Sequence, residues 1–122
     1  MLFIEYPKCS TCKKAKKWLD DHNITYTDRH IVEENPTYDE LKEWYIQSGL
    51  PLKKFFNTSG MLYKEQKLKD RLPEMSEDEQ LQLLATNGMI VKRPLVVKDD
   101  CILVGFKETE WELSLIHISE PT

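Results

Sequence analysis

The fold and the chemistry of this chain depend on one short stretch, Tyr6-Pro7-Lys8-Cys9-Ser10-Thr11-Cys12-Lys13-Lys14. Residues 2–6 are apolar and aromatic and end at a proline, which predicts a short buried strand. From Ser10 onward, apolar residues recur every three or four positions, which predicts an amphipathic helix that stops near Asn23. Cys9 and Cys12 are therefore expected where a strand ends and a helix begins.

Backbone N–H groups at the start of a helix lack partners and carry a partial positive charge. Because such a site stabilises a thiolate, the pKa of Cys9 is expected below the ordinary value of about 8.5. Cys9 is the predicted nucleophile. Cys12 lies three residues further along the same helix face and is the predicted resolving thiol, able to attack a mixed disulfide at Cys9.

Two other interpretations of the cysteine pair stay open. A CxxC motif can be half of a zinc site, but Cys101, His22 and His30 offer no second pair at ligand spacing, so no metal site is predicted. Both cysteines could instead be core residues, because free cysteine is often buried. Cys101, just before an apolar run, is expected to be a core residue of this kind.

The remaining strands follow from shorter patterns. A second strand is predicted over residues 24–31, and a hairpin over 95–97 and 102–104, with a final helix starting at Lys107. A strand pair joined by a helix at one end and a hairpin at the other predicts a mixed four-stranded sheet with helices on its faces, an α/β fold.

The middle of the chain is predicted to be helical. Helical spacing covers residues 37–49, 52–56, 62–71 and 76–87. Two of these helices begin with a capping box, formed by Thr37 with Glu40 and by Ser76 with Glu79.

Composition limits the class of protein. The chain has 122 residues, 40% of them hydrophobic and 31% charged, which is typical of one globular domain. The formal net charge of −4 argues against direct nucleic-acid binding, which relies on basic surfaces. No apolar segment approaches the roughly 20 residues that span a bilayer, so no membrane partner is expected.

The two ends of the chain carry separate expectations. The first residues form no secretion signal, and three cysteines is an odd number, so the protein is expected in the cytoplasm with its thiols mostly reduced. Residues 113–122 resemble the in-frame translation of a sequencing adapter and are predicted to be a non-native tail. One domain is therefore expected over residues 1–112.

Two motifs carry a resemblance to a known family. With Cys9 and Cys12 opening a helix, and Val91-Lys92-Arg93-Pro94-Leu95-Val96-Val97 opening the hairpin, the chain resembles the arsenate reductase (ArsC) and Spx/MgsR family from Leu2 to about Trp111. Residues 57–60, Tyr63 and residues 104–107 resemble small uncharacterised members. The resemblance implies a thioredoxin-like fold, with a helical insertion over about 37–87 and a cis peptide bond between Arg93 and Pro94 that faces the cysteine loop.

Cys9, Arg93 and Pro94 each fall on a motif position of the family that the chain resembles. Arg93 joins Cys9 and Cys12 in the expected catalytic set, where it holds an anionic group near the thiolate. The residues expected around the substrate are Lys8, Ser10, Thr11 and Pro94. Arg93 has a simpler alternative, an ion pair with a surface carboxylate.

These observations favour a thiol-disulfide oxidoreductase of glutaredoxin or ArsC type. It would act on an oxidised thiol or a small molecule, with no bound cofactor and with glutathione or thioredoxin as reductant. The alternative is a redox-sensing regulator that binds the C-terminal domain of the RNA polymerase alpha subunit, as Spx-type proteins do. Arsenate reduction is disfavoured, because Asn57 and Gly105 stand where the resemblance places two further arginines, and because glutathione-linked arsenate reductases lack a cysteine at the position of Cys12.

Overall fold

A mixed four-stranded sheet forms the centre of the computed structural model, which describes residues 1–99 and 101–116. The strands are β1 (Leu2–Glu5), β2 (Thr27–His30), β3 (Leu95–Val97) and β4 (Ile102–Val104). Their order is β2-β1-β3-β4, with β2 parallel to β1 and with β3 antiparallel to both β1 and β4. The predicted sheet and its hairpin are confirmed.

The second strand is shorter than the predicted range of 24–31. It begins at Thr27, which is opposite Leu2, and it ends at His30, which is opposite Glu5. Because β1 itself begins at Leu2, residues 24–26 have no strand to pair with. The length of β1 therefore sets the length of β2.

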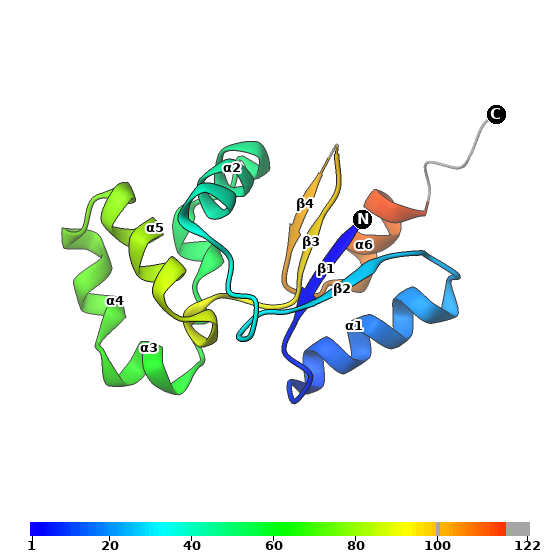
Figure 1. Ribbon diagram of the computed structural model, residues 1–122, viewed down its shortest axis with the longest axis horizontal. Helices are drawn as coiled ribbons and strands as arrows, with labels where there is room; N and C mark the ends of the chain where they lie inside the picture. The colour runs from blue at the N-terminus through cyan, green and yellow to red at the C-terminus, as the bar shows by residue number, and fades with distance from the viewer. Residues whose placement is uncertain (100, 117–122) are drawn as a thin grey trace.

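Helices occupy both sides of the sheet (Figure 1). One side carries α1 (Ser10–Asp21) and α6 (Glu108–Leu115). The other side carries a helical lobe made of α2 (Tyr38–Ser48), α3 (Met61–Glu65), α4 (Leu68–Arg71) and α5 (Glu77–Thr86), with short 3-10 turns at Leu52–Phe55, Leu72–Glu74 and Gly88–Ile90. Helices therefore fill the interval in which an insertion is predicted.

Local sequence signals account for several helix boundaries. Thr37 with Glu40 and Ser76 with Glu79 form the two predicted capping boxes, so both are confirmed. Asn23 adopts a left-handed conformation with φ 57° just after α1, as predicted for a helix stop.

The prediction of one continuous helix over 62–71 is wrong, because two short helices, α3 and α4, occupy this range. Lys67 adopts a left-handed conformation with φ 52°, which separates α3 from α4. Tyr63 and Leu68 on either side of this break are both buried in the helical lobe. The break lets two short helices turn their apolar residues toward the same core.

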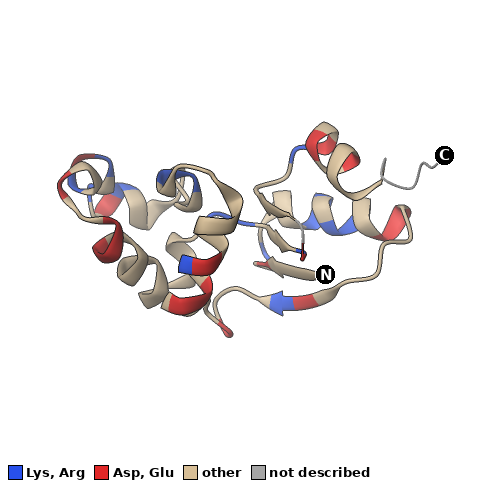
Figure 2. Cartoon of the chain, turned by 90° about the horizontal axis from the view of Figure 1, so that it is seen from above, with Lys and Arg blue, Asp and Glu red and all other residues tan. Residues whose placement is uncertain are grey.

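The alternation of side chains along the strands produces one core on each face of the sheet. Phe3 and Val96 face α1 and α6, where Trp18 and Trp111 pack against them. Ile4 and its neighbours on the opposite face pack against the helical lobe. The sheet and the helical lobe lie beside each other, and two segments of the chain connect them (Figure 2).

The final helix extends past residue 112. It runs to Leu115, and Leu115 and Ile116 pack against the core on the α1 side. Residues 113–116 therefore contact the domain, whereas residues 117–122 lie outside the described residues. The adapter origin of the tail and the single-domain boundary stay predictions. Among the described residues, no helix is both long and apolar enough to cross a membrane.

Candidate active site around Cys9

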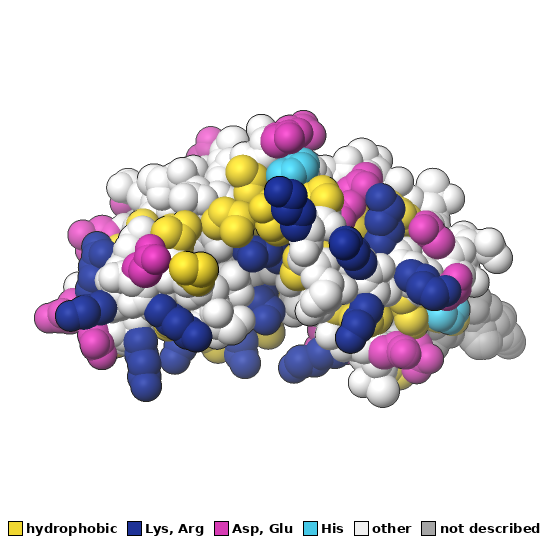
Figure 3. Space-filling view, turned by 90° about the horizontal axis from the view of Figure 1, so that it is seen from below, with side chains coloured by type: hydrophobic (Ala, Val, Ile, Leu, Met, Phe, Trp, Pro, Cys, Tyr) yellow, Lys and Arg dark blue, Asp and Glu magenta, His cyan; other side chains and the backbone are white. Residues whose placement is uncertain are grey.

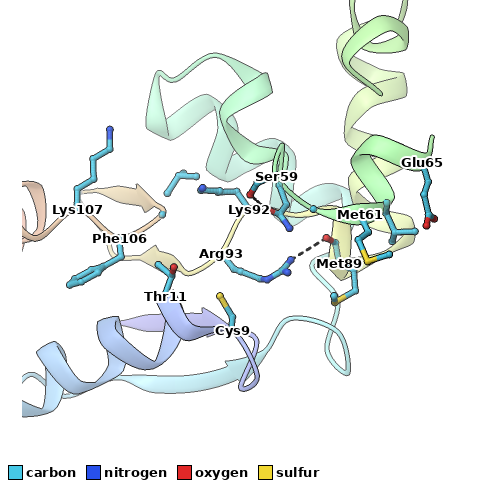
Figure 4. Close-up of a pocket in the computed structure, with 15 residues that line it drawn as sticks. Cys9, Thr11, Ser59, Met61, Glu65, Met89, Lys92, Arg93, Phe106 and Lys107 are labelled. Carbon is cyan, nitrogen blue, oxygen red and sulfur yellow. Dashed lines mark hydrogen bonds between the residues drawn. The ribbon is translucent and has the colours of Figure 1, made fainter. Parts of the chain in front are cut away.

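Cys9 lies at the N-terminus of α1, as the sequence predicts. A tight turn joins it to β1, in which the N–H of Cys9 donates to the carbonyl of Tyr6 at 2.9 Å. The N–H of Lys13 then donates to the carbonyl of Cys9 at 3.1 Å as the helix begins. The Cys9 side chain is half-buried, and its sulfur points into a cleft between α1 and the helical lobe (Figure 4).

The surroundings of Cys9 favour its thiolate. Partial burial acts to raise the pKa of this thiol, but the backbone N–H groups of Cys12 and Thr11, the Cys12 thiol and the positive charge of Arg93 outweigh it. The net effect lowers the pKa of Cys9 below its ordinary value. The helix start thus contributes as expected, and Arg93 adds to it from the other side of the cleft.

Cys12 has the opposite environment. Its side chain is fully buried, and its sulfur accepts a hydrogen bond from the N–H of Tyr6 at 3.5 Å. Burial, with a further contribution from the neighbouring Cys9, raises the pKa of the Cys12 thiol to about 12. Both cysteines are free thiols. The pair therefore combines an accessible, acidic thiol with a buried, protonated one.

Arg93 is held over the cysteine loop by backbone groups. Its Nη1 donates to the carbonyls of Met89 at 3.1 Å and Val91 at 3.2 Å. With its amide turned to present the oxygen, Asn57 accepts from both terminal nitrogens of Arg93 at 3.3 Å. The guanidinium also lies over the ring of Tyr6, 5.3 Å from its centroid.

Arg93 does not form the surface ion pair considered as its alternative. None of the ion pairs between described residues involves it, and its buried Nε has no hydrogen-bond partner. The peptide bond between Arg93 and Pro94 is cis, as the resemblance implies. Among the described residues, Arg93 is therefore a cation without a carboxylate partner; its guanidinium extends toward Met89, and the Cys9 sulfur points toward the Arg93 side chain (Figure 4).

The cleft has a volume of about 880 Å³. The residues that line it come from α1, the helical lobe and the hairpin, and they are Cys9, Thr11, Asn57, Ser59, Gly60, Met61, Leu62, Glu65, Met89, Lys92, Arg93, Val104, Gly105, Phe106 and Lys107. Asn57 and Gly105, which stand at the expected positions of two further arginines, are both among them.

The four residues expected around the substrate are placed differently from one another. Thr11 lines the cleft. Lys8 and Ser10 are exposed beside Cys9 but do not line the cleft, because they lie on the turn and on the outer side of the first helical turn. Pro94 is buried and also lies outside the lining. The structure brings Thr11 together with Cys9 and Arg93, whereas Cys12 lies behind Cys9 in the core.

Sequence reasoning missed two cations in the cleft, Lys92 and Lys107. Both occur within the motifs that carry the family resemblance, one beside Arg93 and the other at the end of residues 104–107. A single lysine forms no distinctive sequence pattern. Only the position of Lys92 and Lys107 within these motifs could have indicated a role in the cleft. The apolar residues Met61, Met89 and Phe106 were missed as well.

Within residues 1–99 and 101–116, no three His, Cys, Asp or Glu side chains gather closely enough to hold a metal ion.

Known proteins resemble the chain over most of its length. The model of the ArsC family matches residues 4–113. The uncharacterized protein YusI of Bacillus subtilis is 55% identical over 92% of this chain and 95% of its own length. The regulatory protein MgsR of the same organism is 30% identical over 90% of this chain and 86% of its own.

Solved structures match the fold as closely. An ArsC family related protein from Bacteroides fragilis superposes with a TM-score of 0.89 at 64% identity, over 92% of this chain and 94% of that one. A possible arsenate reductase from Streptococcus mutans superposes with a TM-score of 0.86 at 45% identity, over 93% and 97% of the two chains.

The mixed sheet, with a cysteine pair at the start of its first helix, is that of a thioredoxin-like α/β protein. Within this class, the chain belongs to the ArsC family and is related to YusI, MgsR and Spx. The family includes arsenate reductases, so membership alone leaves the reaction of this chain open.

Proposed function

We propose that the protein is a cytoplasmic thiol-disulfide oxidoreductase in which Cys9 is the nucleophile and Cys12 the resolving thiol. One observation carries the proposal: Cys9 lies at the N-terminus of α1 on an open cleft, while Cys12 lies buried one turn behind it. A nucleophile has to reach its substrate, and a resolving thiol has to lie close enough to attack the mixed disulfide once it has formed.

The first step is an exchange between two sulfurs. The Cys9 thiolate attacks one sulfur of a disulfide substrate, forms a mixed disulfide with it and expels the other sulfur as a thiolate, which takes up a proton. Cys12 then loses its proton and attacks the Cys9 sulfur. The bound half of the substrate takes up this proton and leaves as a thiol. Cys9 and Cys12 thereby give up two electrons to the substrate and become a disulfide.

The dithiol is restored by an external thiol. Two molecules of glutathione, or one reduced thioredoxin, supply two electrons and two protons and become oxidised in turn. Arg93 supports the cycle, because its charge faces the Cys9 sulfur and stabilises the thiolate as attacking and as leaving group. Thr11 lines the cleft that holds the reacting sulfur, whereas Lys8, Ser10 and Pro94 lie outside its lining and would contact only a substrate that extends beyond the cleft.

Mass spectrometry tests the proposal directly. After mild oxidation with a small disulfide, the wild-type protein is expected to hold an intramolecular bridge between Cys9 and Cys12. The Cys12→Ser variant is expected to trap the mixed disulfide at Cys9, because no thiol remains to resolve it. The Cys101→Ser variant is the matched control and should behave as wild type. A mixed disulfide at Cys101 in place of Cys9 would contradict the assignment.

A second function is supported by the similarity to MgsR, a regulatory protein, and to Spx, a global transcriptional regulator. In this case, oxidation of the same cysteine pair would change a docking surface for the C-terminal domain of the RNA polymerase alpha subunit. A pull-down with that domain under oxidising and reducing conditions separates the two functions. Binding in one redox state only would favour the regulator, and no binding in either state would exclude it.

Arsenate reduction is the least favoured function. An arsenate site would have one guanidinium, Arg93, with Asn57 and Gly105 where two more would be expected. Lysines can bind an oxyanion, but they lack the fork of donors that a guanidinium offers. An assay of arsenate reduction in the presence of glutathione should therefore give no turnover.

A further inference from the structure

A second cavity adjoins the cleft at Cys9. It has a volume of about 530 Å³, and it is lined partly by residues of the 3-10 turn at Leu52–Phe55. Lys92, Val104 and Lys107 line both cavities, so the two meet along these three residues. Together they form one continuous depression, which is called the lysine groove below.

Positive charge is concentrated in the lysine groove. Its cationic residues are Lys53, Lys54, Lys92, Arg93 and Lys107, and its acidic residues are Glu65 and Glu110. The whole chain carries a formal net charge of −4, so the groove has the opposite sign to the protein as a whole. Lys and Arg side chains border the hollow on the face shown in Figure 3. Charge of one sign in a cleft attracts ligands of the other sign.

The cations of the lysine groove are not neutralised within the described residues. Each ion pair between described residues involves Lys16, Lys17 or Arg29, and none of these three residues lines the groove. Among the described residues, the buried Nε of Arg93 also has no hydrogen-bond partner, so the protein does not fully satisfy this guanidinium. A buried donor of this kind is costly unless a ligand satisfies it.

The lysine groove is built on fixed backbone. The N–H of Lys92 donates to the carbonyl of Phe55 at 2.8 Å, and Val91 forms an isolated antiparallel bridge with Phe56. This pairing ties the segment before Arg93 to the turn that carries Lys53 and Lys54. Gly105 leaves room for Lys92, because a Cβ at this position would lie 3.2 Å from its Cε.

The shape of the lysine groove favours an extended ligand. A single pocket of a few hundred Å³ is enough for a small molecule. Here a pocket of that size is added to a larger cleft, and both have apolar walls between their cations. Met61, Met89 and Phe106 line the end near Cys9, while Leu50 and Pro51 line the far end. Alternating apolar and cationic walls suit a polypeptide whose acidic residues are interspersed with apolar ones.

We propose that the lysine groove binds an acidic polypeptide segment, so that the substrate of Cys9 is a disulfide in a protein with acidic residues next to the reactive cysteine. This inference rests on the proposed function and names its substrate class. The Cys9 sulfur forms a disulfide with the cysteine of the segment as the other sulfur of the substrate leaves. Lys92 and Lys107 hold carboxylates near the reacting cysteine, and Lys53 and Lys54 hold carboxylates further along the segment.

Two synthetic peptides test the proposal. Each carries one cysteine as a mixed disulfide with a small thiol, and they differ only in having Glu or Gln at the neighbouring positions. The acidic peptide is expected to react with Cys9 at least about tenfold faster at low salt, because several exposed ion pairs each contribute modestly. Raising the ionic strength from about 0.01 to about 1 M, which shortens the Debye length from about 30 to about 3 Å, should remove the preference.

Variants of the far end sharpen the test. The double variant Lys53→Gln with Lys54→Gln should reduce the ratio of the rates for the acidic and the neutral peptide by about tenfold. Lys64→Gln with Lys69→Gln is the matched control, because both lysines are exposed on the helical lobe and line neither cavity of the groove. An equal loss in both double variants would overturn the proposal.

A binding assay keeps the inference separate from the reaction. Fluorescence anisotropy is measured with labelled peptides in which Ser replaces the cysteine, so that no exchange occurs. Tighter binding of the acidic form, weakened in the Lys53 and Lys54 variant, supports the groove even if no peptide disulfide is reduced. Exchange without any acidic preference overturns the groove and leaves the proposed function intact. Equally tight binding of a single-stranded oligonucleotide would also overturn it, because the site would then be selective only for negative charge.

Discussion

Two clusters of charge adjoin α1, and they are organised in opposite ways. Beneath the helix, Lys16 pairs with Glu5 at 3.7 Å and with Asp28 at 3.0 Å. At the start of the helix, the described partners of Arg93 are two carbonyl groups, the Asn57 amide and the ring of Tyr6, with no carboxylate among them. The cluster under α1 satisfies its own charges, whereas the cluster at Cys9 leaves a cation and a thiolate open to a ligand.

The difference teaches which cluster is structural and which is chemical. Glu5 is only 4% exposed and lies next to Asp28, so a negative charge on Glu5 is costly. The nearby Lys16 offsets part of this cost. The Cys9 cleft carries its cations without such partners among the described residues. Ionisable residues with a shifted pKa that lie in a cleft without charged partners are typical of a functional site. Ionisable residues with a shifted pKa inside a closed ion-pair cluster are typical of a structural role.

The largest expected effect in this comparison comes from Arg93→Gln. Removing the charge should raise the pKa of Cys9, because the positive guanidinium is one of the causes that lower it. At pH 7 the rate of alkylation by iodoacetamide should fall up to about tenfold, since one pKa unit changes the thiolate fraction by that factor. Arg93→Lys keeps the charge and should retain most of the rate. Equal losses in both variants would show that packing, not charge, is responsible.

A smaller effect is expected from Glu5→Gln, and it concerns stability alone. Burial, followed by the neighbouring Asp28, raises the pKa of Glu5 from 4.5 to about 7. The folded chain therefore binds more protons than the unfolded chain between these pH values. The stabilisation from this proton is fully present below about pH 4.5 and is lost as the pH rises through 7.

Urea unfolding at pH 5 and at pH 8 measures this contribution. The wild type is expected to lose stability from this group between the two pH values, and Glu5→Gln should show a weaker dependence because its amide cannot titrate. The alkylation rate of Cys9 should be the same in both proteins. If the two proteins had the same pH dependence of stability, Glu5 would not be the titrating group.

The smallest effect is expected from Lys17→Gln. Lys17 pairs with Asp21 at 3.0 Å on the exposed side of α1, one turn apart. Such pairs stabilise a helix by less than about 0.5 kcal/mol. Thermal unfolding should therefore barely change. A loss of more than about 1 kcal/mol would contradict this expectation, because exposed ion pairs contribute less than that.

Much of the fold could be predicted because its signals are local. The strand before Pro7, the helix periodicity after Ser10 and the two capping boxes all depend on neighbouring residues. The break at Lys67 could not be predicted, because a left-handed lysine has no pattern in the sequence and follows from how Tyr63 and Leu68 pack. The start of the second strand was misjudged because it is set by the length of its partner.

The site was predictable to a similar degree. The position of Cys9 follows from the strand and the helix around it. The sequence could not distinguish a resolving thiol at Cys12 from a cysteine that only packs in the core, because both fit the same helical spacing. The partners of Arg93 are carbonyls of a turn, which no side-chain pattern predicts. Lys92 and Lys107 meet only when the hairpin and the helical lobe are in place.

Titration of the thiols tests the central claim most directly. The ultraviolet absorbance of thiolate is followed against pH in the reduced Cys101→Ser protein, with Cys9→Ser as the control that removes the first transition. The account predicts a thiolate that forms below the ordinary thiol pKa of about 8.5 and is absent from the control, followed by a second transition near pH 12 from Cys12. A first transition at or above the ordinary value would contradict the account.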